Sequence, residues 1–187
     1  MNKAFTKESE FDPGLEVSLR QRNVLPDGVK NYITPSGARR LRRELAVLAD
    51  VERPRLAALL SSRAEAGRGD EAEYRVDQHR LHKLDVQIRW LRERVAGFEI
   101  VDPAQQQCER VRFGATVQVI DLEGEEQVYT IVGVDESDPT KGFISWVSPL
   151  GKALLAASKG DEVKVRLPRG ETLLEVAEID YRATSSE

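Results

Sequence analysis

Three carboxylic acids, Asp70, Glu71 and Glu73, lie within four residues of one another in segment 69–74. Carboxylate oxygens are ligands that hard cations such as Mg²⁺ prefer, and Mg²⁺ usually takes one or two of them while keeping several waters. At a site that already holds one metal ion, such oxygens can recruit a second ion and position a water for phosphodiester hydrolysis. The alternative is a solvated turn whose acids cap the next helix and interact with its dipole.

The segments on either side of these acids predict the element that positions them. Apolar residues recur at alternating steps of three and four, and this spacing places one narrow seam along each of two helices. The seam residues are Ala38, Leu41, Leu45, Leu48, Leu56 and Leu59 before the turn, and Leu81, Leu84, Ile88, Leu91 and Val95 after it. Two such seams indicate an antiparallel coiled coil. At ~1.5 Å rise per residue, arms of about 25–30 residues make a rod of roughly 40 Å, with the acids at its far end.

Proline and glycine mark where these arms begin and end. Thr34 followed by Pro35 predicts a helix start, with the threonine as N-cap and the proline in the first turn. Pro54 removes one helical hydrogen bond, so we expect a kink or a brief break near 51–54. The return arm is expected to end near Ala96 and Gly97.

From residue 111 the apolar period changes to two, which is typical of strands. Five strands are predicted, at 115–120, 128–132, 142–147, 162–166 and 173–179. A short helix is expected after residue 148, with Ser148 as its cap and Pro149 as its first residue. The fold class is therefore α+β: a coiled-coil hairpin followed by an antiparallel sheet with one short helix. The predicted organisation is a disordered extension 1–31, hairpin 32–102, linker 103–110, sheet domain 111–182 and disordered tail 183–187.

Charge divides the chain into basic arms and an acidic remainder. The 187 residues carry a net charge of −4, yet 38–63 and 74–96 hold more arginine and lysine than acid, while the balance reverses from residue 120 onward. Basic helices suit a phosphate backbone and an acidic globule suits a basic protein partner. The alternative is that the arginines only solvate the helices.

Several classes of protein are not indicated by this sequence. No apolar run approaches the ~20 residues of a membrane span, and the single Cys108 permits no internal disulfide, so we expect a cytoplasmic protein without membrane contact. The chain has no glycine-rich phosphate loop, no serine-nucleophile elbow and no Cys/His pair. It therefore lacks the residues for unaided catalysis.

Two sets of motifs resemble a known family. YITPSGARRLRREL at 32–45, VERP at 51–54, AEY at 72–74 and IVDP at 100–103 resemble the coiled-coil domain of the bacterial Gre transcript-cleavage factors. EE at 125–126, YTIVG at 129–133, DE at 135–136, GFIS at 142–145, SPLGKAL at 148–154 and KGDEV at 159–163 resemble their FKBP-like C-terminal domain. The resemblance covers about residues 32–182 and is closer to the GreB branch than to the GreA branch.

This resemblance implies a monomeric factor that docks at the secondary channel of bacterial RNA polymerase and is not itself an enzyme. The C-terminal domain would sit at the channel rim and the hairpin would reach the active centre, where its acids promote cleavage of backtracked RNA. The implied docking residues are Asp135, Glu136, Ser148 and Pro149, and the residues near the nascent RNA 3′ end, with DNA nearby, are Arg80 and Lys83. The isolated protein would bind no cofactor, and Asp70 and Glu71 would share Mg²⁺ with the polymerase.

The tip departs from the family pattern Gly-Asp-x-x-Glu-Asn-Ala-(Glu or Asp)-Tyr. Counting back from 72–74 places Gly67 at the family aspartate and Asp70 at the glutamate, whereas counting forward from 51–54 places Arg68 at the aspartate. A third reading takes Gly69 and Asp70 as a displaced Gly-Asp, with Glu71 or Glu73 as the partner acid. The family asparagine is absent in all three alignments.

Three functions are consistent with these observations. The first is a factor that stimulates transcript cleavage through its tip acids. The second, suggested by the altered tip, is a non-cleaving relative that occupies the same channel and modulates or inhibits transcription. The third, suggested by the C-terminal fold, is a peptidyl-prolyl isomerase or chaperone-like module.

Overall fold

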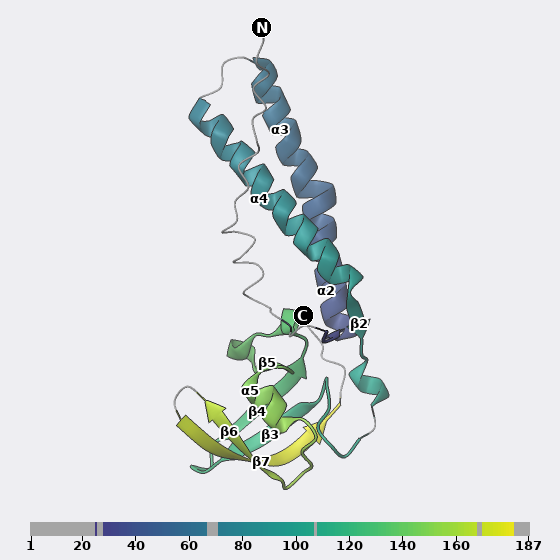
Figure 1. The fold of residues 1–187 in the computed structure, drawn as a ribbon, viewed down its shortest axis with the longest axis vertical. Helices are drawn as coiled ribbons and strands as arrows, with labels where there is room; N and C mark the ends of the chain where they lie inside the picture. Colours follow the sequence, from purple (N-terminus) through teal and green to yellow (C-terminus); the bar gives the residue numbers. More distant parts are fainter. Residues whose placement is uncertain (1–24, 26–27, 67–70, 107, 168–169, 182–187) are drawn as a thin grey trace.

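A computed structural model describes residues 25, 28–66, 71–106, 108–167 and 170–181. Most of the predicted extension 1–31, the tail 183–187 and the tip residue Asp70 lie outside these ranges. Figure 1 shows two long helical arms that run side by side away from a curled sheet. The α+β class with a projecting hairpin is therefore confirmed. Among the described helices, none has the length and apolar character needed to cross a bilayer.

The outgoing arm consists of three consecutive helical stretches, α2 (Pro35–Ala46), η1 (Val47–Glu52) and α3 (Arg53–Ala66). Thr34 is the N-cap of α2, because its side-chain oxygen accepts from the backbone N–H of Gly37 at 3.1 Å. Pro35 occupies the first turn, where an N–H would have no helical acceptor. The predicted start of the hairpin is confirmed.

The expected irregularity at Pro54 takes the form of a π-helix. Stretch η1 ends with the N–H of Arg53 bonded to the carbonyl of Leu48, five residues back. In a regular α-helix, Pro54 would leave one carbonyl without its hydrogen bond and its ring would clash with the preceding turn. The wider π-turn accommodates both effects. It also rotates the turns of α3 that come after it, so that Leu56 and Leu60 are each 8% exposed while Leu59 is 41% exposed. The prediction that Leu59 continues the seam was wrong, because the extra residue of the π-turn shifts the register.

The return arm is α4 (Glu71–Ala96), 26 residues that pack along α2 and α3. Ile88 and Leu91 are 3% and 1% exposed, as the seam predicted. At the base, Leu91 joins Ala38 and Leu41 of α2 in one apolar cluster. Each Å² of apolar surface that is buried here contributes roughly 25 cal/mol of stabilisation, and this burial holds the arms together at the base.

A two-stranded parallel ladder closes the base of the hairpin. β1 (Asn31–Ile33) pairs with β2 (Phe98–Ile100), and the N–H of Val101 extends the ladder to the carbonyl of Ile33 at 2.9 Å. Ile33 is fully buried beneath it. Three-residue strands carry too short an apolar pattern for sequence to reveal.

The globular domain is built on a five-stranded sheet with the order β5-β4-β3-β7-β6. The strands are β3 (Thr116–Asp121), β4 (Glu126–Val132), β5 (Phe143–Ser145), β6 (Glu162–Leu167) and β7 (Gly170–Asp180). Alternate residues such as Val117, Val119 and Val176 are fully buried beneath the sheet. All five predicted strands are present, but β5 runs parallel to β4, so the sheet is mixed rather than antiparallel.

Short helices complete this domain. α5 (Pro149–Leu154) begins as predicted, with the Ser148 hydroxyl accepting from the N–H of Gly151 at 3.0 Å. The single turns are η2 (Pro103–Gln105), η3 (Val134–Glu136) and η4 (Pro139–Lys141). The last two lie in the crossover from β4 to β5, which lets β5 enter the sheet parallel to β4.

Replacing Gly37 by alanine is expected to lower the free energy of unfolding by about 2 kcal/mol, the scale of overpacking a core. The added Cβ would lie 2.1 Å from Oε1 of Glu136, a buried side chain. Helix propensity alone favours alanine by about 1 kcal/mol, so the sign of the change is informative. Urea unfolding measures it, with Gly97→Ala as the matched control, since its nearest atoms outside the adjacent residues lie 3.6 Å away. Equal stability of the two variants would contradict this account.

Candidate functional site

The described tip acids occupy the first turn of α4. The side chains of Glu71 and Glu73 are 82% and 65% exposed. Glu71 pairs with Arg75 of its own helix at 2.9 Å, whereas Glu73 pairs across the hairpin with Arg63 of α3 at 3.2 Å. Both carboxylates are therefore open to solvent at the far end of the rod. Asp70 lies outside the described residues.

Arg63 connects the two arms next to the tip. Besides Glu73 it binds Asp77, with Nη1 at 2.8 Å from Oδ2, and the Asp77 side chain is only 14% exposed. One guanidinium thus joins two carboxylates that lie one helical turn apart on α4. This bridge links the two arms close to the tip.

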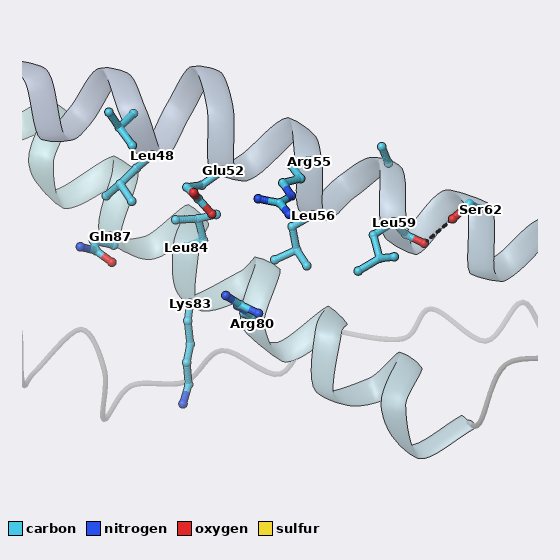
Figure 2. Close-up of a pocket in the computed structure, with 12 residues that line it drawn as sticks. Leu48, Glu52, Arg55, Leu56, Leu59, Ser62, Arg80, Lys83, Leu84 and Gln87 are labelled. Atoms are coloured by element: carbon cyan, nitrogen blue, oxygen red, sulfur yellow. Dashed lines mark hydrogen bonds between the residues drawn. The ribbon is translucent and has the colours of Figure 1, made fainter.

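A groove of about 1080 Å³ lies between α3 and α4, halfway along the hairpin. Leucines from both arms line it, together with the cations Arg55, Arg80 and Lys83 and the acid Glu52. Figure 2 shows Arg55 and Arg80 between the two helices, with Lys83 extending outward from α4. Within the described ranges, no carboxylate forms an ion pair with Arg55, Arg80 or Lys83. The predicted RNA-proximal residues therefore belong to one basic, partly apolar groove.

A second polar cluster joins the hairpin to the globular domain. The carboxylate of Glu136 on η3 accepts from the N–H of Thr34 at 2.9 Å, the N–H of Gly133 at 3.1 Å and the hydroxyl of Thr34. Glu136 is 8% exposed and Thr34 is 1% exposed. The residue that caps α2 is therefore also held by a carboxylate 102 positions further along the chain.

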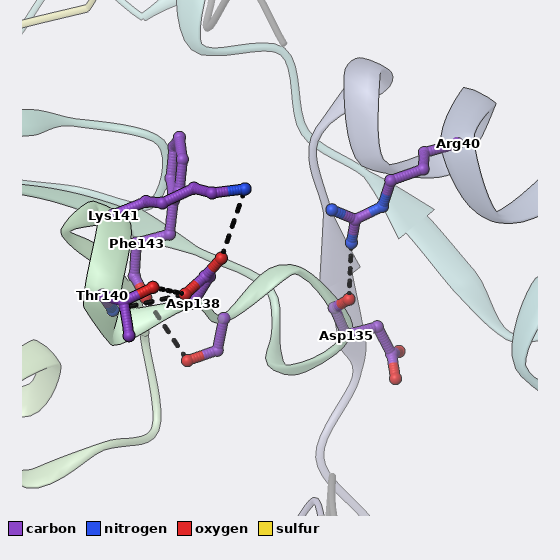
Figure 3. Close-up of polar contacts among 7 residues, drawn as sticks. Arg40, Asp135, Asp138, Thr140, Lys141 and Phe143 are labelled. Carbon is purple, nitrogen blue, oxygen red and sulfur yellow. Dashed lines mark hydrogen bonds and ion pairs between the residues drawn. The ribbon is translucent and has the colours of Figure 1, made fainter. Parts of the chain in front are cut away.

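Asp135 adds further contacts to this junction. Its carboxylate accepts from the side-chain amide of Asn31 at 3.0 Å and pairs with Arg94 of α4 at 3.3 Å. Figure 3 shows Arg40 of α2 donating to the backbone carbonyl of Asp135, at 2.8 Å. Tyr32 of β1 contributes an aromatic contact, with its ring 5.3 Å from that of Trp146. Both β1 and the two helices at the base of the hairpin thus contact the globular domain.

Comparison with known proteins reproduces this two-part architecture. The profile of "Transcription elongation factor, N-terminal" matches residues 31–100, and that of "Transcription elongation factor, GreA/GreB, C-term" matches residues 105–181. Transcription elongation factor GreB of Neisseria meningitidis is 38% identical over 154 residues, which cover 81% of this chain and 94% of the relative. This chain belongs to the GreA/GreB family of transcription elongation factors.

Other members of the GreA/GreB family show similar identity. GreB of Yersinia pestis is 40% identical over 81% of this chain and 90% of the relative. GreA of Wolinella succinogenes is 38% identical over 84% of this chain and 99% of the relative. Among solved structures, GreA factor homolog 1 of Thermus thermophilus aligns over 81% of this chain and 99% of its own, at 22% identity and a TM-score of 0.39.

In this GreA/GreB family member, the predicted docking residues fall into two groups. The side chains of Asp135, 2% exposed, and Glu136 face the junction and bind residues of the same chain. Their carboxylates are therefore engaged in joining the two domains, and no docking role is needed to explain them. Ser148 is partly exposed and caps α5, whereas Pro149 is exposed on the surface. Docking through this segment stays a prediction.

Sequence reasoning missed the hairpin side of the junction. Asn31, Arg40 and Arg94 carry no local motif, and their partners lie between about 40 and 100 positions away. The one available signal was Thr34, which was predicted only as a helix cap. A polar group buried at that position needs hydrogen-bond partners, but sequence does not say which residue supplies them.

Near this junction, Asp138 caps η4, and its pKa lies below the ordinary value. The main cause is the hydrogen bond from the Thr140 hydroxyl, at 2.6 Å, and the Lys141 ammonium at 3.5 Å adds a Coulombic contribution (Figure 3). Because the folded-state pKa is lowered, the stabilisation is present above the unfolded pKa and is lost as pH falls through the folded one.

Thr140→Val is expected to raise the pKa of Asp138 toward its ordinary value, because valine keeps the shape of threonine but removes the hydroxyl donor. An NMR titration of the side-chain carboxyl carbon measures this shift. Lys141→Met, which removes the ammonium with its charge and its hydrogen bond, should raise the pKa less. If the methionine variant shifts the pKa more than the valine variant does, the assignment of the main cause is wrong.

Proposed function

We propose that this factor binds RNA polymerase and, through carboxylates at its hairpin tip, promotes Mg²⁺-dependent cleavage of backtracked nascent RNA. The observation that supports this best is the exposure of Glu71 and Glu73 at the far end of a 26-residue helix. Such a helix is ~39 Å long, enough to carry these acids away from the globular domain into another enzyme. The polymerase would supply the active centre, and this chain would be an accessory factor.

The two domains would have different roles in this proposal. The globular domain, with the Ser148 and Pro149 segment, would bind at the rim of the secondary channel while the hairpin passes inward. Arg63 holds the arms together at the tip, and Glu136 holds their base on the globule. Acids on a rod fixed at both ends lose less conformational freedom on binding than acids on a free loop.

The carboxylates of the tip are suitable ligands for a hard cation, but the three of them do not bind one ion together. Two residues apart on a helix, Glu71 and Glu73 point roughly 200° apart and do not face the same ion. Glu73 is also drawn toward α3 by Arg63. Asp70 with Glu71 is therefore the pair we assign to metal holding. When bound there, Mg²⁺ would stabilise the charge that develops on a phosphodiester and activate a water.

Arg80 and Lys83 fit the same picture. They follow Glu71 by nine and twelve positions on α4, so they lie ~14 and ~18 Å from it along the helix axis. Cations at that distance could neutralise phosphates of an RNA strand whose 3′ end is near the tip. They would hold the strand rather than take part in its cleavage.

The proposal is tested with a backtracked elongation complex carrying end-labelled RNA. Adding this protein with Mg²⁺ should shorten the RNA faster than polymerase alone does, and the protein should co-migrate with the complex. Absence of binding would overturn the proposal altogether.

A second function is favoured by one specific observation, the departure of the tip from the family motif. A relative that occupies the channel without cleaving would bind the complex and displace an authentic cleavage factor, yet leave the RNA length unchanged. The same assay separates the two functions, because binding without shortening selects the second.

A further inference from the structure

The groove between α3 and α4 has the character of a peptide-binding surface rather than of a filled coiled-coil interior. Leu59 on its α3 side is 41% exposed, and Leu56 and Leu84 form the apolar walls. A volume of about 1080 Å³ is close to the upper end of the range typical of ligand-binding pockets. The register shift at η1 contributes to this groove, because it turns Leu59 out of the seam and into the groove while Leu56 and Leu60 stay buried.

Charge surrounds these leucines. The groove is lined by three cations, Arg55, Arg80 and Lys83, and by one acid, Glu52, and among the described residues none of the three cations forms an ion pair with a carboxylate. Because cations beside an apolar surface favour an occupant that combines carboxylates with bulky apolar side chains, an acidic amphipathic segment is the chemistry that this groove fits.

Such a segment lies in this chain ahead of the hairpin. Residues 8–16, Glu-Ser-Glu-Phe-Asp-Pro-Gly-Leu-Glu, contain four acids, two large apolar residues and no basic residue. They are outside the residues that the structure describes and outside the part matched by the family profiles, which begins at residue 31. We propose that segment 8–16 binds in the groove between α3 and α4 of the same molecule.

The length of the intervening chain permits this contact. The groove begins beside Val47, about 12 helical residues or ~18 Å beyond the base of the hairpin. The 12 residues from 16 to 28 span up to ~40 Å when extended and have a typical end-to-end distance of ~19 Å as a flexible chain. A tether this short gives segment 8–16 an effective concentration in the millimolar range at the groove. A Kd of about 1 mM between the segment and the groove is therefore enough for half occupancy.

Occupancy of the groove would cover the cations that the proposed function assigns to RNA. The acidic segment would then act as an internal competitor, which leaves when a nucleic-acid phosphate offers a stronger partner. The inference goes beyond the proposed function and holds whether or not the tip supports cleavage.

The experiment uses the full chain with a spin label on segment 8–16. In a Cys108→Ser background, Ser9→Cys places the label between two acids without altering their charge. Paramagnetic broadening of amide NMR signals is expected at Leu56, Leu59 and Leu84, and not in the sheet of the globular domain. Broadening spread evenly over the molecule, or concentrated on another surface, would overturn the proposal.

Charge reversal then tests the cause. The triple change Arg55→Glu, Arg80→Glu and Lys83→Glu should abolish the selective broadening. A matched triple change of exposed helical arginines away from the groove, Arg39→Glu, Arg89→Glu and Arg92→Glu, alters the net charge equally and should leave it intact. Persistence of the broadening in the groove variant, or its equal loss in both, would refute the charge-based contact.

A second variant guards against unfolding of the groove mutant. Changing Glu8, Glu10 and Asp12 to lysine leaves every described residue untouched and should also abolish the broadening. If the signal survives this change, segment 8–16 is not the occupant.

Discussion

Glu71→Ala is expected to lower stimulated transcript cleavage by on the order of 100-fold, the scale on which losing one preorganised electrostatic group slows a catalysed reaction. Binding to the polymerase should not change, because Glu71 lies at the opposite end of α4 from the globular domain (Figure 1). Cleavage assays on backtracked complexes and a separate binding titration measure the two effects.

Single variants should rank the tip acids. Asp70→Ala is expected to match Glu71→Ala, whereas Glu73→Ala should have a smaller effect because Glu73 is paired with Arg63 across the hairpin. Glu93→Ala is the matched control, an exposed glutamate of the same helix near its other end. Normal cleavage by every tip variant would remove the acids from the mechanism. A dominant effect of Glu73 would instead reassign the metal-holding pair.

Glu136→Ala is the change with the largest expected effect on stability, a loss of about 2–4 kcal/mol. It leaves the buried N–H groups of Thr34 and Gly133 without the acceptor that lies 2.9 and 3.1 Å from them. It also removes the partner of the Thr34 hydroxyl, so the start of α2 is no longer held on η3.

Amide hydrogen exchange gives the sharpest readout of this change. If these amides exchange by local opening of the junction, lowering the free energy of opening by about 2 kcal/mol corresponds to roughly 30-fold faster exchange at Thr34 and Gly133. Glu136→Gln, which keeps one acceptor oxygen, should be milder, and Glu109→Ala removes an exposed glutamate as a control. Unchanged protection at both amides would show that Glu136 does not hold the junction.

The junction also predicts coupling between two positions. Gly37→Ala is destabilising because its Cβ would meet the Glu136 side chain. Since truncation of Glu136 removes that side chain, the clash should vanish in the double variant. The two losses are therefore expected to be non-additive, as they are for contacting residues in general. Such non-additivity would show that Gly37, the third residue of α2, is in contact with the Glu136 carboxylate that holds the hairpin.

Much of the fold could be predicted because its signals are local. The seams, the Thr34 and Ser148 caps and the five strands each depend on neighbours within a few positions, where helix and strand periodicity act directly. Even the disturbance before Pro54 was foreseeable, since a proline cannot donate the helical bond. Its form as a π-helix, and the exchange of Leu59 for Leu60 in the seam, depended on how α3 packs against α4.

The junction and the parallel pairings could not be predicted in the same way. Asp135 and Glu136 are acids in a polar turn by sequence, and such residues are usually exposed. Only the approach of Thr34, Asn31 and Arg94 from distant parts of the chain makes them buried acceptors. The parallel partners of β1 and β5 were likewise set by chain connections rather than by side-chain pattern.

Residue patterns were enough to predict a two-arm helical rod with acids at its turn, followed by a small sheet domain. They were enough because apolar periods, caps and turns act over a few residues. Which acids face solvent, which of them join the domains, and where a basic groove lies between the arms became visible only in the folded structure. Those outcomes depend on packing between segments far apart in the chain, where burial and hydrogen-bond satisfaction select the partners.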